Sequence, residues 1–336
     1  MKLLICTQVV DSEDVYLGFF VRWIAELSKH YECVHVICLK EGKHALPKNV
    51  FVHSLGKESG ESRIKYLSRF YRYIWSLRRE YDAVFVHMNQ EYVLLGAKLW
   101  LVLQKPIFMW RNHNAGSLLT DIAVLFCHKV FCTSKYSYTA KYRKTTLMPI
   151  GVDTDLFKFK EGLRDQNSVL SLGRISEAKR PEMLIEALSI LQSRGIACTA
   201  SFYGPGSSSY IDALKTQTQE CGVEDRVTFF NGVPHTETSQ IYARHLIYVN
   251  AATSGMYDKA IFEAAASGCI VFAASRDFVI AAGEDLAFSN ASELAEKLAR
   301  TLSLPAEAWD VLRARLQKIA QENSLHTLVE QLVVAI

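Results

Sequence analysis

Short runs rich in valine, isoleucine and phenylalanine alternate with amphipathic, helix-like segments along the whole chain. The runs are KLLICT, CVHVICL, VFVHSL, AVFVHM, PIFMW and KVFCTS in the first half, then SVLSLG, ASFYG, RVTFFN, IYVN and CIVFAA. Strands that are apolar on both faces and separated by helices are typical of parallel sheets covered on both sides. The pattern therefore predicts an α/β protein built from doubly wound parallel sheets.

A polar, turn-rich segment at residues 148–168 separates the two series of strands. A chain of 336 residues is also longer than one ordinary hydrophobic core and suits two domains of about 150 residues each. We expect an N-terminal domain over residues 1–150 and a C-terminal domain over residues 151–336, both Rossmann-like. The last helix is a candidate to pack back on the N-terminal domain.

Composition limits the possible partners and locations. Apolar residues make up 49% of the chain and charged residues 22%, as in soluble globular proteins, and a net charge of +3 is too small to indicate nucleic-acid binding. Lys98 interrupts the longest apolar run, which therefore falls short of the roughly 18 residues of a membrane span, and MKLLICTQ is too short for a secretion signal. We expect a cytoplasmic protein.

The eight cysteines predict neither disulfides nor a structural metal site. Cys6, Cys33, Cys38, Cys132 and Cys198 lie in strand-like apolar runs, and no C-x-x-C pair or Cys/His cluster with zinc spacing is present. Reduced thiols in the core of a cytosolic protein are the simplest interpretation.

Polar segments follow the strands of the first half. They are TQVVDSED, HMNQEY, WRNHNAG and TSKYS, and they include His87 and His113. Ligands of doubly wound sheets bind at the carboxyl ends of the strands, so this edge indicates a ligand-binding enzyme. Ordinary polar loops are the alternative.

Three cations lie at one strand-to-helix turn in the second half. Arg174 directly follows a strand, and Lys179 precedes a helix that begins near Pro181. Two cations and a helix N-terminus at the carboxyl end of a strand suit an anion of diphosphate size. Arg180 is expected to point to water, and a solvated turn is the alternative for the whole group.

A carboxylate lies on an apolar helix within residues 250–274. Ser254 and Gly255 are predicted to form a turn, Asp258 to cap the helix, and Glu263 to lie among alanine, isoleucine and phenylalanine. A carboxylate in such surroundings is costly unless it accepts hydrogen bonds. Either a structural partner satisfies Glu263, or this side chain accepts hydrogen bonds from paired sugar hydroxyls.

Several segments resemble the retaining GT-B glycosyltransferases of glycosyltransferase family 4. In the second half they are PIGVDTDLF, GRISEAKRPEMLIEAL, GVEDRVTFFNGV and DKAIFEAAASGCIV, and in the first half VDSEDVYLGFFVRWIAELSKH and WRNHNAG. The resemblance covers nearly the whole chain. It implies a GT-B fold, with two Rossmann-like domains facing across a cleft, and transfer of a sugar from a nucleotide-diphosphate sugar with retention at the anomeric carbon. The acceptor would be a glycan or lipid-linked glycan in cell-envelope polysaccharide or glycoconjugate synthesis.

The resemblance also implies roles for residues at matching positions. Arg174 and Lys179 would hold the donor diphosphate as catalytic residues, and His113 would lie near the reacting carbon and the acceptor. Glu263 would bind the ribose hydroxyls, and Gly18 would let the backbone approach the diphosphate. The other implied donor-binding positions are Gly255, Met256, Tyr257 and Asp258 beside the sugar, and Gly204, Pro205, Gly232 and Val233 near the base.

One position departs from the family pattern. The family's paired glutamates have seven residues between them, and that spacing before Glu263 falls on Gly255. The sugar-contacting carboxylate is therefore absent, and Asp258 is a candidate to replace it in part. Because no Asp-x-Asp motif is present, we expect Arg174 and Lys179 to act without a metal ion, with no cofactor beyond the donor substrate.

Three alternative functions were weighed against glycosyl transfer. A non-hydrolysing sugar-nucleotide epimerase shares the two-domain architecture, and a non-catalytic nucleotide-sugar binding protein would keep Arg174 and Lys179 without needing His113. A nicotinamide dehydrogenase is disfavoured because no G-x-G-x-x-G follows the first strand. The first two remain open.

Residues 61–80 predict a helix with two contrasting faces. The predicted core-facing residues are Ile64, Leu67, Phe70, Tyr71, Ile74 and Leu77, and the basic face consists of Lys65, Arg69, Arg72 and Arg79. A basic face of this kind is either simply solvated or attracted to an anionic membrane, where each cation contributes about 1 kcal/mol. The second interpretation predicts a peripheral enzyme on the inner face of the cell membrane.

Overall fold

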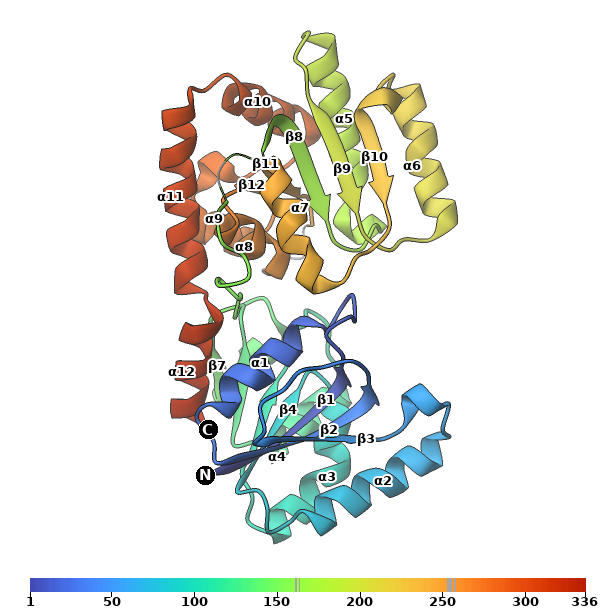
Figure 1. Cartoon of the computed structure of the whole chain (residues 1–336), viewed down its shortest axis with the longest axis vertical. Helices are drawn as coiled ribbons and strands as arrows, with labels where there is room; N and C mark the ends of the chain where they lie inside the picture. The colour runs from blue at the N-terminus through green and yellow to red at the C-terminus, as the bar shows by residue number, and fades with distance from the viewer. Residues whose placement is uncertain (161, 163, 253–255, 257) are drawn as a thin grey trace. The chain divides into compact units, whose positions relative to one another are not determined.

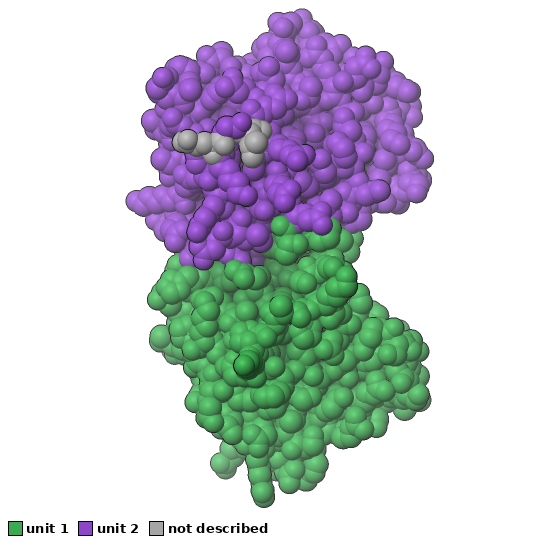
Figure 2. All heavy atoms as spheres, viewed as in Figure 1, with its two compact units in different colours: residues 1–151, 234–236, 325–336 green, residues 152–233, 237–324 purple. Residues whose placement is uncertain are grey.

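The computed structural model describes residues 1–160, 162, 164–252, 256 and 258–336, which form two compact units (Figure 2). Unit 1 contains Met1–Gly151, Pro234–Thr236 and Leu325–Ile336. Unit 2 contains Val152–Val233 and Glu237–Ser324. The chain therefore leaves the first unit after Gly151, returns to it briefly, and returns again at Leu325.

Unit 1 is built on a parallel sheet of seven strands in the order β3-β2-β1-β4-β5-β6-β7 (Figure 1). The strands are β1 (Lys2–Val10), β2 (Cys33–Glu41), β3 (Val50–Ser54), β4 (Ala83–His87), β5 (Ile107–Trp110), β6 (Lys129–Cys132) and β7 (Thr145–Leu147). Every residue of β4 and β5 is buried, which is why these runs are apolar at consecutive positions. The sequence did not predict β7, a three-residue strand at the sheet edge with two threonines.

Helices cover both faces of this sheet. They are α1 (Phe19–Ser28), α2 (Arg63–Ser76), α3 (Gln90–Val102), α4 (Leu118–Phe126) and α12 (Leu325–Ala335), with short 3-10 turns at η1 (Lys57–Ser59) and η2 (Tyr138–Lys141). Helix α12 lies beside α1, and its buried Leu328 and Leu332 share a hydrophobic core with Trp23 (Figure 1). The indole Nε1 of Trp23 also donates a hydrogen bond of 3.0 Å to the carbonyl of Gly151.

Helix α2 differs from its predicted orientation. Phe70 and Ile74 are buried as expected, but Ile64 is 79% exposed, and Leu67 and Tyr71 are also exposed. The helix instead turns its tyrosines Tyr66 and Tyr73 toward the core, together with Phe70, Ile74 and Leu77. The prediction was wrong because it placed Tyr71 on the core face in place of Tyr66 and Tyr73, tyrosines whose apolar rings can pack in a core while the hydroxyl reaches a polar partner.

The basic face of α2 is also less uniform than predicted. Glu61, just before the helix, pairs with Lys65 at 2.7 Å and with Arg69 at 2.9 Å. The guanidinium of Arg69 further donates to the carbonyl of Leu55 at 3.0 Å. Two of the four cations are therefore engaged within the protein. Among the described residues, no helix has the length and hydropathy needed to span a bilayer.

Unit 2 is built on a parallel sheet of five strands in the order β10-β9-β8-β11-β12. The strands are β8 (Asp165–Leu172), β9 (Thr199–Tyr203), β10 (Val227–Phe230), β11 (His245–Asn250) and β12 (Ile270–Ala273). The helices are α5 (Pro181–Ser193), α6 (Ser208–Glu220), α7 (Thr238–Arg244), α8 (Lys259–Ala266), α9 (Arg276–Ala282), α10 (Ala291–Leu302) and α11 (Ala306–Glu322). Short 3-10 turns are η3 (Glu177–Lys179), η4 (Glu224–Arg226) and η6 (Glu284–Leu286), while η5 (His235–Glu237) begins in the short segment that belongs to unit 1.

Candidate functional site

The strand order of unit 2 reverses direction between β8 and β11, where ligands of doubly wound sheets bind. The carboxyl ends of these two strands border a small hollow. Its lining includes Gly173, Arg174 and Lys179 after β8, and Asn250 at the end of β11. The two predicted diphosphate-binding cations therefore border one hollow at the expected edge of the sheet.

Two glycines at this edge let the backbone segments after β8 and β9 approach each other closely. Gly173 has φ +142° and Gly204 has φ +150°, values that disfavour other residues. A Cβ on Gly204 would lie 1.8 Å from the carbonyl oxygen of Gly173, whereas a Cβ on Gly173 would meet open space. Gly204 is therefore required by the packing of its own unit, whatever part it has in binding a base.

A polar network holds Lys179 in place. Its Nζ pairs with Oδ2 of Asp258, which also accepts a hydrogen bond of 2.8 Å from Nδ2 of Asn250. The same amide lies 3.3 Å from the hydroxyl of Tyr248, which donates to the carbonyl of Leu172 at 3.2 Å. The network thus ties the cation after β8 to the ends of β11 and β8 and to the start of α8.

Asp258 also caps α8, as predicted, because its Oδ1 accepts from the backbone N–H of Ala260 at 3.4 Å. Burial favours the neutral acid, but the charge of Lys179 and the hydrogen bonds from Lys179, Asn250 and Ala260 outweigh it and lower the pKa of Asp258. Three of the roughly four acceptor positions of this carboxylate are thus in use. One position at most remains for a sugar hydroxyl.

The other two cations of the turn differ in exposure. Arg174 is exposed on the rim of the hollow, while Arg180 is half-buried and its side chain forms no hydrogen bond or ion pair with the described residues. Arg180 adopts a left-handed conformation with φ 50° at the N-cap of α5. Pro181 supplies no N–H, and the N–H of Met183 donates to the carbonyl of Arg180 at 3.2 Å, so the first turn of α5 offers few backbone donors beside the cations.

Glu263 lies buried in α8, where it is 4% exposed. Its Oε2 accepts a hydrogen bond of 3.3 Å from the hydroxyl of Tyr242, a fully buried residue of α7. Burial and the nearby Glu263 charge raise the pKa of Tyr242 well above its usual value, so the phenol stays a donor. One oxygen of Glu263 thus has a structural partner, as the alternative interpretation of this residue required.

Lys259 precedes Glu263 by one helical turn. Burial lowers the pKa of the Lys259 ammonium to about 7, against the opposing charges of Glu263 and Asp153. Met256 is buried, and its carbonyl accepts from Oγ of Ser275 at 2.9 Å. The predicted site residues Gly255 and Tyr257 lie outside the described residues.

In unit 1, Gly18 is the N-cap of α1 at the end of the loop after β1. A Cβ at this position would lie 2.6 Å from the carbonyl oxygen of Asp14 and 2.9 Å from that of Ser12. The backbone N–H of Gly18 donates to Asp14 O at 3.0 Å. This loop folds tightly on itself and needs a glycine for that reason alone.

His113 is exposed in the loop after β5. Its Nδ1 lies 2.9 Å from the backbone nitrogen and 3.1 Å from the carbonyl oxygen of Ala115, so Nδ1 faces the backbone whichever ring nitrogen carries the proton. The carbonyl of His113 accepts from the N–H of Tyr138 at 2.9 Å and lies 3.3 Å from Oγ of Ser137. These contacts hold the loop while the far side of the imidazole remains available.

His87, by contrast, points into the core. It is 2% exposed, stacks on Phe20 with ring centroids 3.7 Å apart, and lies 3.3 Å from Oγ1 of Thr7 through Nδ1. The remaining predicted base-pocket residues, Pro205, Gly232 and Val233, are half-buried in the loops after β9 and β10.

Asn250 and Tyr242 were not predicted. Asn250 ends a buried strand, so a polar residue at the last position of IYVN was the available signal. Tyr242 gave no signal, since its contact with Glu263 joins helices 21 residues apart in sequence.

Two family models match the chain. Residues 153–323, just over half of the chain, match the model described as Glycosyl transferases group 1. The protein belongs to this family. Residues 9–110 match a second model, Glycosyl transferase 4-like. Family membership agrees with the resemblance noted from the sequence.

Curated relatives match only in part. A segment of 131 residues is 27% identical to the GtfA subunit of the UDP-N-acetylglucosamine–peptide N-acetylglucosaminyltransferase of Streptococcus gordonii, covering 39% of this chain and 25% of that protein. A segment of 100 residues is 32% identical to a GDP-mannose-dependent alpha-(1-6)-phosphatidylinositol monomannoside mannosyltransferase of Mycolicibacterium smegmatis, covering 27% of this chain and 26% of that protein. These matches thus span about a quarter of each relative.

Solved structures match over the whole chain. Anabaena Alr3699/HepE in complex with UDP has a TM-score of 0.77 at 19% identity and covers 100% of this chain and 99% of that chain. WaaG, a glycosyltransferase involved in lipopolysaccharide biosynthesis, has a TM-score of 0.69 at 15% identity, with 99% of each chain covered. The glycosyltransferase group 1 protein therefore has a GT-B fold.

Proposed function

We propose that the protein is a retaining glycosyltransferase that moves a sugar from a nucleotide-diphosphate sugar to a glycan or lipid-linked acceptor. The observation that carries this proposal is the placement of Arg174 and Lys179 at the strand-order reversal of unit 2, on the hollow at the end of β8. Family membership favours this function over the epimerase and the non-catalytic binding protein.

In this proposal Arg174 and Lys179 bind the diphosphate and stabilise the charge that develops on it as the glycosidic bond breaks. The ammonium of Lys179 has three donors and can keep Asp258 while it binds a phosphate oxygen. The carboxylate of Glu263 would accept from a ribose hydroxyl, and Nε2 of His113 would face the acceptor. No metal ion takes part in these steps.

Fewer observations bear on the identity of the donor base and the donor sugar. The relatives use UDP-N-acetylglucosamine and GDP-mannose, and HepE was solved with UDP, so UDP and GDP sugars are the first candidates. Thermal unfolding with UDP, GDP and ADP would discriminate among them. A ligand at 100 times its dissociation constant adds about 2.7 kcal/mol of stability.

The main test is nucleotide-diphosphate binding by calorimetry. Arg174→Ala should weaken binding by about 1.5 to 3 kcal/mol, the range for a hydrogen bond to a charged group, and Arg180→Ala should do little. Unchanged affinity in Arg174→Ala would contradict the site. His113→Ala should reduce sugar transfer to an acceptor with little loss of donor affinity.

We further propose that unit 1 binds an anionic membrane surface through α2. The exposed side of this helix carries Ile64, Leu67, Tyr71 and Trp75 beside Arg72, and Arg79 is exposed in the turn that follows the helix. An apolar stripe flanked by cations is typical of helices that lie in a membrane interface. Membrane binding through α2 would thus depend on apolar side chains that enter the membrane interface as well as on charge.

Co-sedimentation with vesicles of graded anionic lipid content tests this second proposal. Trp75→Ser and the pair Arg72→Gln with Arg79→Gln should each reduce binding at low salt. Lys65→Gln is the matched control because Lys65 already pairs with Glu61. Absence of binding at low salt, or equal effects of all three changes, would contradict a membrane role for α2.

A further inference from the structure

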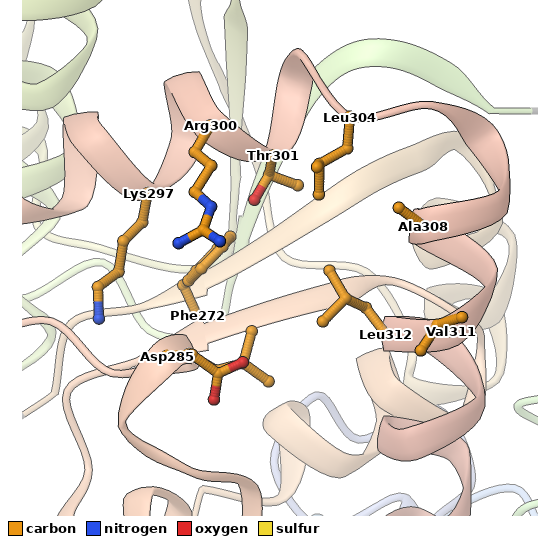
Figure 3. A pocket seen from close by; sticks show the side chains of 10 residues that line it. Phe272, Asp285, Lys297, Arg300, Thr301, Leu304, Ala308, Val311 and Leu312 are labelled. Carbon is orange, nitrogen blue, oxygen red and sulfur yellow. The ribbon is translucent and has the colours of Figure 1, made fainter.

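Unit 2 contains a second cavity, of about 400 Å³, bounded by β12, η6, α10 and α11 (Figure 3). It shares no lining residue with the hollow at the end of β8. Its volume lies within the range of small-molecule sites, near the lower end. The cavity therefore has the size for one small ligand outside the donor site.

Most of the lining is apolar. The apolar residues are Phe272, Leu286, Leu304, Ala308, Val311 and Leu312. Phe272 and Leu286 are buried and form the inner part, whereas Val311 on α11 is 71% exposed. An outward-facing valine beside a hollow leaves an apolar wall in contact with water, which a bound aliphatic chain would cover.

The charged residues around the cavity leave one cation without a partner. Asp285 pairs with Arg315 at 2.6 Å, and Nζ of Lys297 donates to the carbonyl of Glu284 at 2.7 Å and lies 3.2 Å from Glu293. The guanidinium of Arg300 forms no hydrogen bond or ion pair within the described part of the chain. Figure 3 shows its guanidinium extending from α10 toward Phe272, with Thr301 next to it.

We propose that this cavity binds an anionic amphiphile with a single aliphatic chain. The chain would lie along Leu304, Ala308 and Val311, and the anionic head would pair with the guanidinium of Arg300, which suits a phosphate or a carboxylate. The small volume favours one chain over a two-chain lipid. The proposal does not depend on the identity of the sugar donor, because the two sites use different residues.

Calorimetric titration of the full chain with decyl phosphate, decanoate and 1-decanol, all below micelle-forming concentrations, tests the proposal. We expect saturable binding of one decyl phosphate per chain, about tenfold or more tighter than 1-decanol, since one charge-assisted hydrogen bond contributes that much. The phosphate and carboxylate probes show which head group the guanidinium prefers. Inorganic phosphate alone should bind far more weakly than decyl phosphate.

Two variants locate the site. Arg300→Gln should lower the affinity for decyl phosphate about tenfold and leave that for 1-decanol unchanged. Val311→Glu, at an exposed position that tolerates the change, should abolish binding of the anionic probes. Val334→Glu is the matched control, since Val334 is 88% exposed on α12 in unit 1.

Three results would overturn the proposal. They are no saturable binding, equal affinities for decyl phosphate and 1-decanol, and binding unaffected by both Arg300→Gln and Val311→Glu. Ala308→Trp, which fills the cavity, adds a further check if thermal unfolding shows that the variant folds. Retained binding in that folded variant would also reject the cavity as the site.

Discussion

The pairing of Lys179 with Asp258 makes these two residues energetically dependent on each other. Replacing Lys179 with Met leaves the Asp258 carboxylate, whose side chain is 24% exposed, without its cation. A hydrogen bond between charged groups contributes about 1.5 to 3 kcal/mol, and partial exposure of both partners reduces that value. We therefore expect a coupling free energy of about 1 to 2 kcal/mol between the two positions.

A double-mutant cycle measures this coupling. The four proteins are the wild type, Lys179→Met, Asp258→Asn and the double variant. Native-state hydrogen exchange of the α8 amides reports the opening of unit 2 separately from unit 1. The double variant should lose about as much stability as Lys179→Met alone. Effects that add to within about 0.5 kcal/mol would refute the argument that the pair holds the turn in place.

Three further predictions follow from single contacts. Tyr242→Phe removes one hydrogen bond of the buried Glu263 and should destabilise α8 by about 1 to 2 kcal/mol in the same exchange measurement; unchanged protection would remove Tyr242 from the network. Gly204→Ala should lower the melting temperature clearly more than Gly173→Ala, because both positions have positive φ but only the first would clash with backbone; equal losses would contradict this. Because the pKa of Asp258 is lowered in the folded protein, its stabilisation is complete above the unfolded value of about 4 and is lost as the pH falls through the lower folded value. The stability difference between the wild type and Asp258→Asn should therefore be constant above about pH 5 and shrink below it, and a difference independent of pH would argue against the lowered pKa.

The strands and the anion site differ in how far the sequence could predict them. Apolar runs marked the buried strands correctly, since burial on both faces leaves a strong local pattern, but β7 has too few apolar residues to show one. The turn of Arg174 and Lys179 was visible because both cations lie beside one strand end. The Lys179–Asp258 contact joins residues 79 positions apart and depends on the strand order β8-β11, which no local pattern encodes.

The orientation of α2 about its own axis shows a second limit of prediction from the sequence. The pattern of apolar residues located the helix and its buried Phe70 and Ile74, but Tyr66 and Tyr73 decided which neighbours turn inward. Glu61 was also overlooked as the partner of Lys65 and Arg69, although it lay within the predicted helix, four and eight residues before them. A helical projection does not show which of several tyrosines packs inward, or which carboxylate reaches a given cation.

The return of α12 to unit 1 has a consequence for how the chain folds during synthesis. The strands of the first sheet are complete in the nascent chain after Leu147, yet the helix that covers part of its core begins only at Leu325. Until then, the surface around Trp23 that α12 covers stays without its partner while all of unit 2 emerges. We therefore expect unit 2, although it is synthesised later, to reach its native packing before unit 1. The apolar surface around Trp23, exposed until α12 is made, should be the part of the nascent protein most dependent on chaperones.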